Sequence, residues 1–298
     1  MTTPDQSGVA GRTNPIINLC RPRELEDALN FYIYHPIALR LATALKPSGV
    51  SPNAVSVAGG AMVLLAAGLY STNLWPYAIF LALLCHISWH ILDGTDGDLA
   101  RMTGRSSAMG ELIDGLSDYI SHIALYLLLI IMLGRLIGTE GYVLGICAGL
   151  SRIVQANHYE VQRRQYQYWV YGTAWLRTPV QQSVSLNFIM RSLAYIYLFL
   201  GKILAPGAAK IEACIDRAAS DITHIEANRQ VIKCAYLPVL KGLSPLGANY
   251  RTLVLGASML AGSPVYFFLY EAIVLNVILA RSIWKCRNTA IKIVAKID

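Results

Sequence analysis

Long apolar runs recur along this chain and constrain its fold more than any other feature. They cover about residues 54–71, 75–92, 108–135, 139–157 and 251–284. A helix needs roughly 20 mostly apolar residues to cross a bilayer, and the last run has room for two spans broken near Gly262. Only 14% of the residues are charged, whereas an ordinary soluble domain carries about 25%. The sequence therefore predicts an all-α, polytopic membrane protein with about six transmembrane helices.

The segments outside these runs divide the chain into four parts. Residues 1–50 are expected to form a polar tail and an amphipathic interfacial helix, with Tyr32 and Tyr34 at head-group depth. Residues 51–171 are expected to form the transmembrane catalytic core. A mostly cytoplasmic helical insert is expected over 172–246, followed by a C-terminal transmembrane hairpin and basic tail over 247–298.

The excess of basic residues indicates how the chain is oriented. The formal net charge is +7, and Arg and Lys gather before Ser51, at Arg101 and Arg105, and in the C-terminal tail. The turns near 71–76 and 261–264 carry no basic residue. By the positive-inside rule, we expect both termini and the loop after the second run to be cytoplasmic, in a bacterial inner membrane or the endoplasmic reticulum. Anionic membrane lipids explain this charge better than nucleic acid does.

Four aspartates lie where the second run ends and the third begins. Asp93 and Asp96 are three residues apart, and Asp114 and Asp118 are four apart. Each spacing puts two carboxylates on one helix face, and a short turn lets the two faces meet. A carboxylate near the middle of a membrane helix costs about 2.5–3.5 kcal/mol, so four together need compensating positive charge. Ligation by oxygen alone suits Mg²⁺ or Mn²⁺ rather than zinc, and we expect a pair of ions that clamp a phosphate.

Small and basic residues beside these acids indicate room for a phosphorylated ligand. Gly97 and Ala100 lie on or beside the first acidic face, and Gly110 continues the second face backwards. The missing side chains let a bulky ligand approach two backbones closely. Arg101 can neutralise a diphosphate through its forked guanidinium.

The order of these residues resembles the signature of the CDP-alcohol phosphotransferase (phosphatidyltransferase) family. In the pattern Asp-x2-Asp-Gly-x2-Ala-Arg-x8-Gly-x3-Asp-x3-Asp, the fixed positions are matched by Asp93, Asp96, Gly97, Ala100, Arg101, Gly110, Asp114 and Asp118. The likeness in layout runs from about Glu24 to Tyr159, and the C-terminal hairpin also fits. The resemblance implies six membrane helices, a homodimer and two divalent metal ions. It also implies transfer of a substituted phosphate from a CDP-linked alcohol to an acceptor alcohol, with release of CMP.

The resemblance assigns each matched acid a role. Asp93, Asp96 and Asp114 are expected to bind metal. Asp118 is expected to lie closest to the acceptor hydroxyl and to act as general base, while also touching a metal.

The remaining matched residues are expected to form the nucleotide site. The resemblance places Gly97, Ala100, Arg101 and Gly110 along the CDP. Asn53, with Ser56 three residues later, resembles the family's Asn-x2-Thr at the start of the first span. Asn53 is therefore expected to contact the diphosphate.

Several polar residues near the signature have more than one reading. His86 and His90 are spaced for metal binding, but hydrogen bonding between helices is the preferred reading. His122 lies four residues beyond Asp118 and either orients it or is a satisfied core histidine. Asp98 lies outside the signature and is expected to face solvent.

A polar stripe runs along the fourth span and consists of Ser151, Gln155, His158 and Gln162. It either lines a substrate cavity or faces the bundle interior. Glu271, in the last span, is expected to pair with an internal group.

Aromatic residues follow this stripe: Tyr166, Tyr168, Trp169 and Tyr171. Such a cluster is typical of an interfacial belt, with recognition of a quaternary ammonium by cation–π contact as the alternative.

The identity of the two alcohols stays open. The donor is either CDP-diacylglycerol or a CDP-aminoalcohol, and a phosphorylated acceptor would need a basic pocket such as Arg152, Arg163 or Arg164 could supply. The alternative function is a divalent-cation transporter with the aspartates as its ion site. It is disfavoured because the acids lie at one end of the bundle and no internal repeat is apparent.

Overall fold

The protein is helical throughout the part of the chain that the structure describes. This computed structural model describes residues 23–72, 74–173, 204–218 and 221–297, and every regular element in these ranges is a helix. The all-α prediction is therefore confirmed. The predicted polar tail before residue 23 lies outside the described residues.

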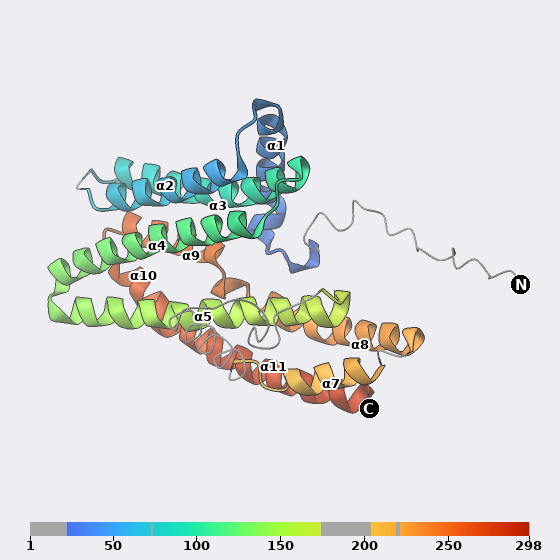
Figure 1. Ribbon diagram of the computed structural model, residues 1–298. Helices are drawn as coiled ribbons and strands as arrows, with labels where there is room; N and C mark the ends of the chain where they lie inside the picture. The colour runs from blue at the N-terminus through green and yellow to red at the C-terminus, as the bar shows by residue number, and fades with distance from the viewer. Residues whose placement is uncertain (1–22, 73, 174–203, 219–220, 298) are drawn as a thin grey trace, which may run out of the picture.

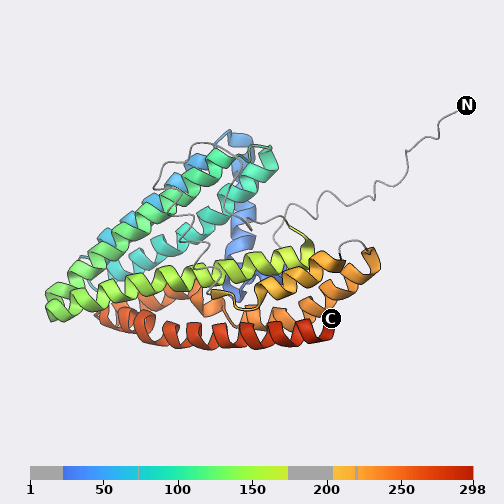
Figure 2. The same cartoon turned by 60° about the horizontal axis from the view of Figure 1, so that its bottom comes forward.

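Three long helices make up the half of the molecule that carries the signature. They are α2 (Pro52–Tyr70), α3 (Tyr77–Thr103) and α4 (Ala108–Ile137). Ser51 caps α2 by accepting a hydrogen bond from the Ala54 N–H, and a proline follows at the first helical position, which needs no N–H donor. α2 approaches α4 closely because Gly60 has no side chain: a Cβ there would lie 2.3 Å from Ser117 Oγ. The three helices lie side by side in both views (Figures 1 and 2).

The other half is built on two helical segments that are longer than a membrane is thick. One is α5 (Thr139–Tyr171), and the other runs continuously through α10 (Val265–Leu269), η6 (Tyr270–Val274) and α11 (Leu275–Ile297). Each contains 33 residues. At about 1.5 Å per residue, each is about 50 Å long, compared with a hydrocarbon core of about 30 Å. Each segment is therefore longer than is needed to cross the hydrocarbon core.

The two halves meet at one end and separate towards the other. α4 and α5 converge at the turn around Gly138 and diverge towards their other ends in both views (Figures 1 and 2). α9 (Ala248–Leu260) joins the halves because it packs against both α3 and α10. α1 (His35–Leu45) crosses the end of α3 on the open side.

Within the described ranges, four segments have the length and apolar character of membrane spans. They are α2, α3, α4 from Met109 onwards, and Val265–Ile297. The polytopic membrane fold is therefore confirmed. The other two of the six expected helices correspond to α5, which carries the polar stripe, and to α9, which has 13 residues.

The described part of the expected insert is helical. α7 (Ala208–Ala218) and α8 (Ile222–Lys241) pack on α5 and α11 around the buried side chains of Trp169 and Tyr236. Residues 174–203, which include most of the apolar stretch in the insert, lie outside the described residues.

The N-terminal segment packs on α3 and is not one continuous surface helix. A π-helix (Asn30–Tyr34) leads directly into α1. Tyr32 is 75% exposed, as expected at head-group depth, but Tyr34 is buried and stacks on His90 with ring centroids 5.0 Å apart. The prediction for Tyr34 was wrong because the helix face that carries it turns towards α3. The missing side chain of Gly94 allows this close contact between α1 and α3: a Cβ on Gly94 would lie only 3.0 Å from Ala38 Cβ.

The aromatic cluster at the end of α5 is also packed inwards. Tyr166 and Trp169 are buried, so an interfacial belt is wrong for these two residues. Both the Tyr166 and Tyr171 hydroxyls donate hydrogen bonds of 2.6 Å to Glu24, and Lys233 forms an ion pair of 2.8 Å with the same carboxylate. Glu24 therefore ties the N-terminal segment to α5 and α8.

The contribution of the Glu24 contacts to stability is expected to fall at low pH. Burial acts to raise the pKa of Glu24, but the hydrogen bonds from Lys233, Tyr166 and Tyr171 outweigh it and leave the pKa below its ordinary value of 4.5. A lowered carboxyl pKa stabilises the fold above pH 4.5, and this contribution is lost as the pH falls through the folded-state pKa. We expect Glu24→Gln to cost about 1 kcal/mol at pH 7, a Tm decrease of roughly 2–4 °C. The difference from the wild type should shrink in thermal denaturation near pH 3.

The matched control for this experiment is Glu226→Gln, because Glu226 is an exposed acid on α8. It should leave the Tm unchanged at both pH values. A Glu24→Gln protein as stable as the wild type at pH 7 would contradict the proposed tie.

The polar stripe on α5 faces the bundle interior. Gln155 accepts a hydrogen bond from Arg251 on α9, and His158 shares one with Ser282 on α11. Gln162 accepts one from the Tyr236 hydroxyl on α8. These contacts confirm the interior reading and leave the stripe joined to three other helices.

Glu271 lies in this interior, as expected. Its side chain is fully buried and accepts a hydrogen bond of 2.6 Å from Arg251, which is itself 3% exposed. A buried charge of either sign is costly unless it is paired. Glu271 and Arg251 therefore each offset the cost of burying the other.

Candidate active site

The acids of the signature converge where α3 ends and α4 begins. Gly104 ends α3 in the left-handed region at φ +65°, and Ser107 starts α4 by accepting a hydrogen bond of 3.0 Å from the Gly110 N–H. This short turn brings the two acidic faces together. One carboxylate oxygen from each of Asp93, Asp114 and Asp118 lies within 4.8 Å of the other two.

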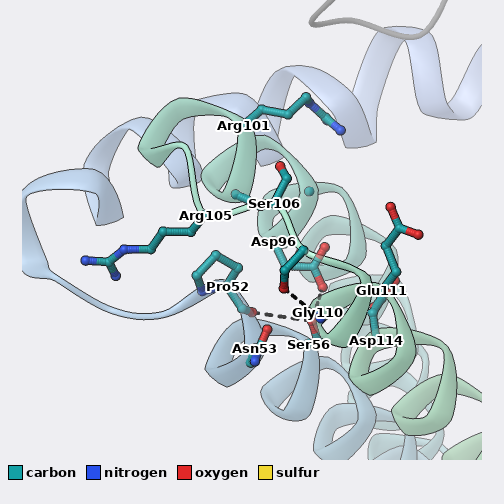
Figure 3. A pocket seen from close by; sticks show the side chains of 13 residues that line it. Pro52, Asn53, Ser56, Asp96, Arg101, Arg105, Ser106, Gly110, Glu111 and Asp114 are labelled. Atoms are coloured by element: carbon teal, nitrogen blue, oxygen red, sulfur yellow. Dashed lines mark hydrogen bonds between the residues drawn. The ribbon is translucent and has the colours of Figure 1, made fainter.

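Asp96 completes the group from the α2 side. Its carboxylate is 5% exposed and accepts a hydrogen bond of 2.5 Å from Ser56 Oγ on α2. The signature helices and α2 therefore all contribute to one site, as Figure 3 shows.

The chemistry of this donor set fits a hard divalent cation. The donors are carboxylate oxygens with no thiol among them, and such donors favour Mg²⁺ or Mn²⁺ over zinc. Gathered carboxylates repel one another, and a bound cation removes that repulsion.

A pocket opens beside the acids, between the start of α2, the end of α3 and the start of α4 (Figure 3). It is lined by Pro52, Asn53, Ser56, Asp96, Gly97, Ala100, Arg101, Arg105, Ser106, Ser107, Gly110, Glu111 and Asp114. All five residues that we expected at the nucleotide, from Asn53 to Gly110, lie on its wall. Asp93 and Asp118 belong to the acid cluster but are not among the lining residues.

Comparison with known proteins agrees with this geometry. The family model for CDP-alcohol phosphatidyltransferases matches residues 49–211, just over half of the chain. The chain belongs to the CDP-alcohol phosphatidyltransferase family. No curated protein matches it at a significant level.

Membership fixes the general activity. A CDP-alcohol phosphatidyltransferase is a membrane transferase of phospholipid synthesis that uses a CDP-linked alcohol as donor and a second alcohol as acceptor. The family uses divalent metals, in agreement with the clustered carboxylates.

The structure adds pocket residues that lie outside the expected site. Arg105, Ser106, Ser107 and Glu111 line the pocket from the turn and the first turn of α4. Their position between two matched residues, Arg101 and Asp114, was the available signal. The sequence identified Ser56 only as the partner of Asn53 in the Asn-x2-Thr-like motif. The structure shows that it also donates a hydrogen bond to Asp96.

Asp98 corrects one expectation. It is 5% exposed, not solvent-facing, and it accepts a hydrogen bond of 2.6 Å from Arg101. On another element, His35 Nε2 of α1 lies 3.9 Å from Asp98 Oδ2. Because Arg101 is held by Asp98, its guanidinium lies at the rim and points away from Asp96 (Figure 3).

The histidines near the acids are hydrogen bonded inside the bundle. His90 and His86 both contact Thr252 on α9, at 2.8 and 3.3 Å. This confirms the preferred reading of bonding between helices. His122 contacts the backbone oxygen of Asp118 at 2.9 Å through Nδ1.

The arginines considered for a phosphorylated acceptor have protein partners. Arg163 and Arg164 both pair with Glu160, at 2.8 and 2.5 Å. Arg152 donates to the Tyr126 hydroxyl at 2.8 Å and lies 3.9 Å from Glu271. None of the three lines the pocket beside the acids.

Adding a side chain at Gly110, on the pocket wall, should weaken donor binding. A Cβ on Gly110 would lie 3.3 Å from both Asn53 Oδ1 and Ser107 Oγ. We expect Gly110→Ala to raise the KM for the CDP-linked donor about ten-fold, equivalent to about 1.4 kcal/mol of binding free energy, with a smaller change in kcat. Steady-state kinetics with varied donor would measure this.

Gly68→Ala is the matched control, because a Cβ on this exposed helical glycine meets nothing within 4 Å. It should leave both constants unchanged. An unchanged KM in Gly110→Ala would mean that the donor does not pass between α2 and α4.

Proposed function

We propose that this protein transfers a substituted phosphate from CDP-diacylglycerol or a CDP-aminoalcohol to an acceptor alcohol and releases CMP. The observation that carries the proposal is the cluster of Asp93, Asp114 and Asp118, whose oxygens lie within 4.8 Å of one another beside a lined pocket. Four carboxylates gathered at the end of a membrane bundle are costly unless a cation and a phosphate use them.

The acids divide into two roles in this proposal. Asp93, Asp96, Asp114 and Asp118 would hold two ions of Mg²⁺ or Mn²⁺. When bound, the metal stabilises charge on the phosphoryl group and its leaving oxygen. Asp118 takes the proton from the acceptor hydroxyl as the new phosphorus–oxygen bond forms. Its place in the acid cluster but outside the pocket lining supports this role, because the acceptor must attack from the side opposite the departing CMP.

The pocket is assigned to the CDP part of the donor. Gly97, Ala100 and Gly110 leave space along both helices, and Asn53 and Arg101 supply polar groups for the diphosphate. Because Arg101 is paired with Asp98, its positive charge at the pocket is partly compensated before the donor binds. Arg105 adds a second guanidinium at the same rim.

The decisive experiment is a transfer assay on purified protein. Labelled CDP-diacylglycerol or CDP-choline is supplied with Mg²⁺ or Mn²⁺ and with inositol, serine, glycerol phosphate or diacylglycerol. We expect CMP release that requires both the metal and one acceptor, and this release also identifies the two alcohols. Absence of CMP release from every donor would overturn the proposal. Cation flux into proteoliposomes without transfer would favour the transporter.

We further propose that the active site and the C-terminus are cytoplasmic and that the protein is a homodimer. The ends of α3, α5 and α11 lie towards the same side of the molecule (Figure 1), and the last turns of α3 and α11 carry Arg101 and Lys296. This asymmetry is the one that the positive-inside rule describes. Labelling of the exposed Cys234 by an impermeant thiol reagent should occur only from the cytoplasmic face. Mass measurement in native nanodiscs would test the dimer.

A further inference from the structure

A tryptophan on α3 makes direct contact with the proposed general base. The indole Nε1–H of Trp89 donates a hydrogen bond of 2.6 Å to Oδ1 of Asp118 on α4. Trp89 is 7% exposed and does not line the nucleotide pocket. The N–H of a buried tryptophan usually finds a hydrogen-bond partner, and here the partner is a carboxylate, to which a hydrogen bond is stronger than one between neutral groups.

The indole is held in place from three sides. The ring centroids of His122 and His90 lie 4.3 and 4.4 Å from that of Trp89. His90 is itself fixed by a hydrogen bond of 2.8 Å to Thr252 on α9. On the third side lies Gly59 of α2, where a Cβ would come within 3.3 Å of Trp89 Cδ1.

This arrangement restricts how Asp118 can present its carboxylate. The N–H of Trp89 occupies Oδ1, and His122 contacts the backbone oxygen of the same residue at 2.9 Å. A side-chain rotation that brought both carboxylate oxygens towards the acid cluster would break the hydrogen bond to Trp89. Oδ1 keeps one further acceptor position, and Oδ2 is the oxygen that this contact leaves for a cation or an acceptor hydroxyl.

We propose that Trp89 is a positioning residue for the transfer reaction: it holds Oδ1 of Asp118 and so fixes the direction in which the carboxylate presents Oδ2 to the reacting groups. The catalytic meaning of this contact rests on the proposed function of Asp118, but the contact itself does not. A purely structural Trp89 would fill space between α2, α3 and α4, and its N–H would have no effect on the acid.

Nuclear magnetic resonance of the indole N–H tests the contact without any turnover. The chain has five tryptophans, so ¹⁵N-tryptophan labelling gives a simple spectrum of the wild-type protein. Trp89→Phe and Asp118→Ala both identify the resonance. We expect it to lie downfield of the other indoles, to shift in Asp118→Ala, and to keep its position when Mg²⁺ is added. An ordinary indole shift, no response to Asp118→Ala, or displacement by Mg²⁺ would each overturn the proposal.

Kinetics then test the consequence. Trp89→Phe keeps an aromatic ring but loses the N–H, and we expect kcat to fall at least about ten-fold while the KM for the donor changes less than about two-fold. Trp284→Phe, on the exposed face of α11, is the matched control and should keep wild-type kinetics. A Trp89→Phe protein with wild-type kcat, or an equal loss in kcat and donor binding, contradicts a positioning role.

The resonance and kinetic experiments distinguish a failure of this proposal from a failure of the proposed function. If the wild-type protein shows no transfer with any donor, the proposed function fails while the resonance arm still reports whether Trp89 holds Asp118. If Trp89→Phe does not fold, the resonance can still be identified with Asp118→Ala in the full-length protein.

Discussion

Asp118→Asn is expected to lower kcat by about 10²–10⁴-fold, the range typical of losing a general base. The asparagine side chain has the same shape, and its oxygen can still accept the hydrogen bond from Trp89. It cannot take a proton from the acceptor. Because Asp118 does not line the pocket proposed for the nucleotide, the KM for the donor should change only a few-fold. Initial rates of CMP release, measured with the donor and then the acceptor varied, would test both statements.

Two comparisons sharpen this result. Asp114→Asn should impair donor binding as well as kcat, because Asp114 belongs both to the acid cluster and to the pocket wall. Glu140→Gln replaces an exposed acid at the distant start of α5, and this variant should keep wild-type kinetics. Full turnover in Asp118→Asn would remove the general base from the proposed mechanism.

The acid cluster could be predicted because its geometry is local. A spacing of three or four residues fixes the face on which a side chain lies, whatever surrounds the helix. The turn between Gly104 and Ser107 is also encoded locally, by a left-handed glycine and a helix-capping serine. The meeting of Asp93 with Asp114 and Asp118 follows from these two features.

The predictions that failed depended on long-range contacts. Tyr34 is buried by α3, and Tyr166 and Trp169 are buried in a core that includes residues of α8 and α11. Helical periodicity shows that such side chains share a face, but it does not show what covers that face. The aromatic residues near the expected membrane surface were therefore assigned to head groups when their partners lie within the chain.

The contacts of Asp98 and Trp89 had a local signal in the sequence that our predictions did not use. Asp98 and Arg101 are three residues apart on one helix, which is the spacing of a paired acid and base. Trp89 precedes Asp93 by four residues and so shares its face, just as His122 shares that of Asp118. Neither Asp98 nor Trp89 occupies a fixed position of the signature.

Glu271→Leu is expected to cause the largest loss of stability among substitutions outside the active site. The leucine removes the only acid within ion-pair distance of Arg251 among the described residues. Arg251 is 3% exposed and would keep a buried, uncompensated charge. Breaking a buried pair in this way costs about 3–5 kcal/mol, which corresponds to a Tm decrease of roughly 10 °C for a protein of this size. Thermal unfolding in detergent, followed by circular dichroism, would measure it.

The double variant Arg251→Met, Glu271→Leu separates the charge effect from packing. Removing both charges should restore part of the lost stability, because no unpaired ion remains. Recovery should be incomplete, since Arg251 also donates hydrogen bonds to Gln155 and to the backbone oxygen of Leu246. Those two acceptors would then be buried without a donor. A double variant no more stable than Glu271→Leu alone would show that the glutamate contributes through its volume and hydrogen bonds, and that its charge does not hold α9 against α5 and η6.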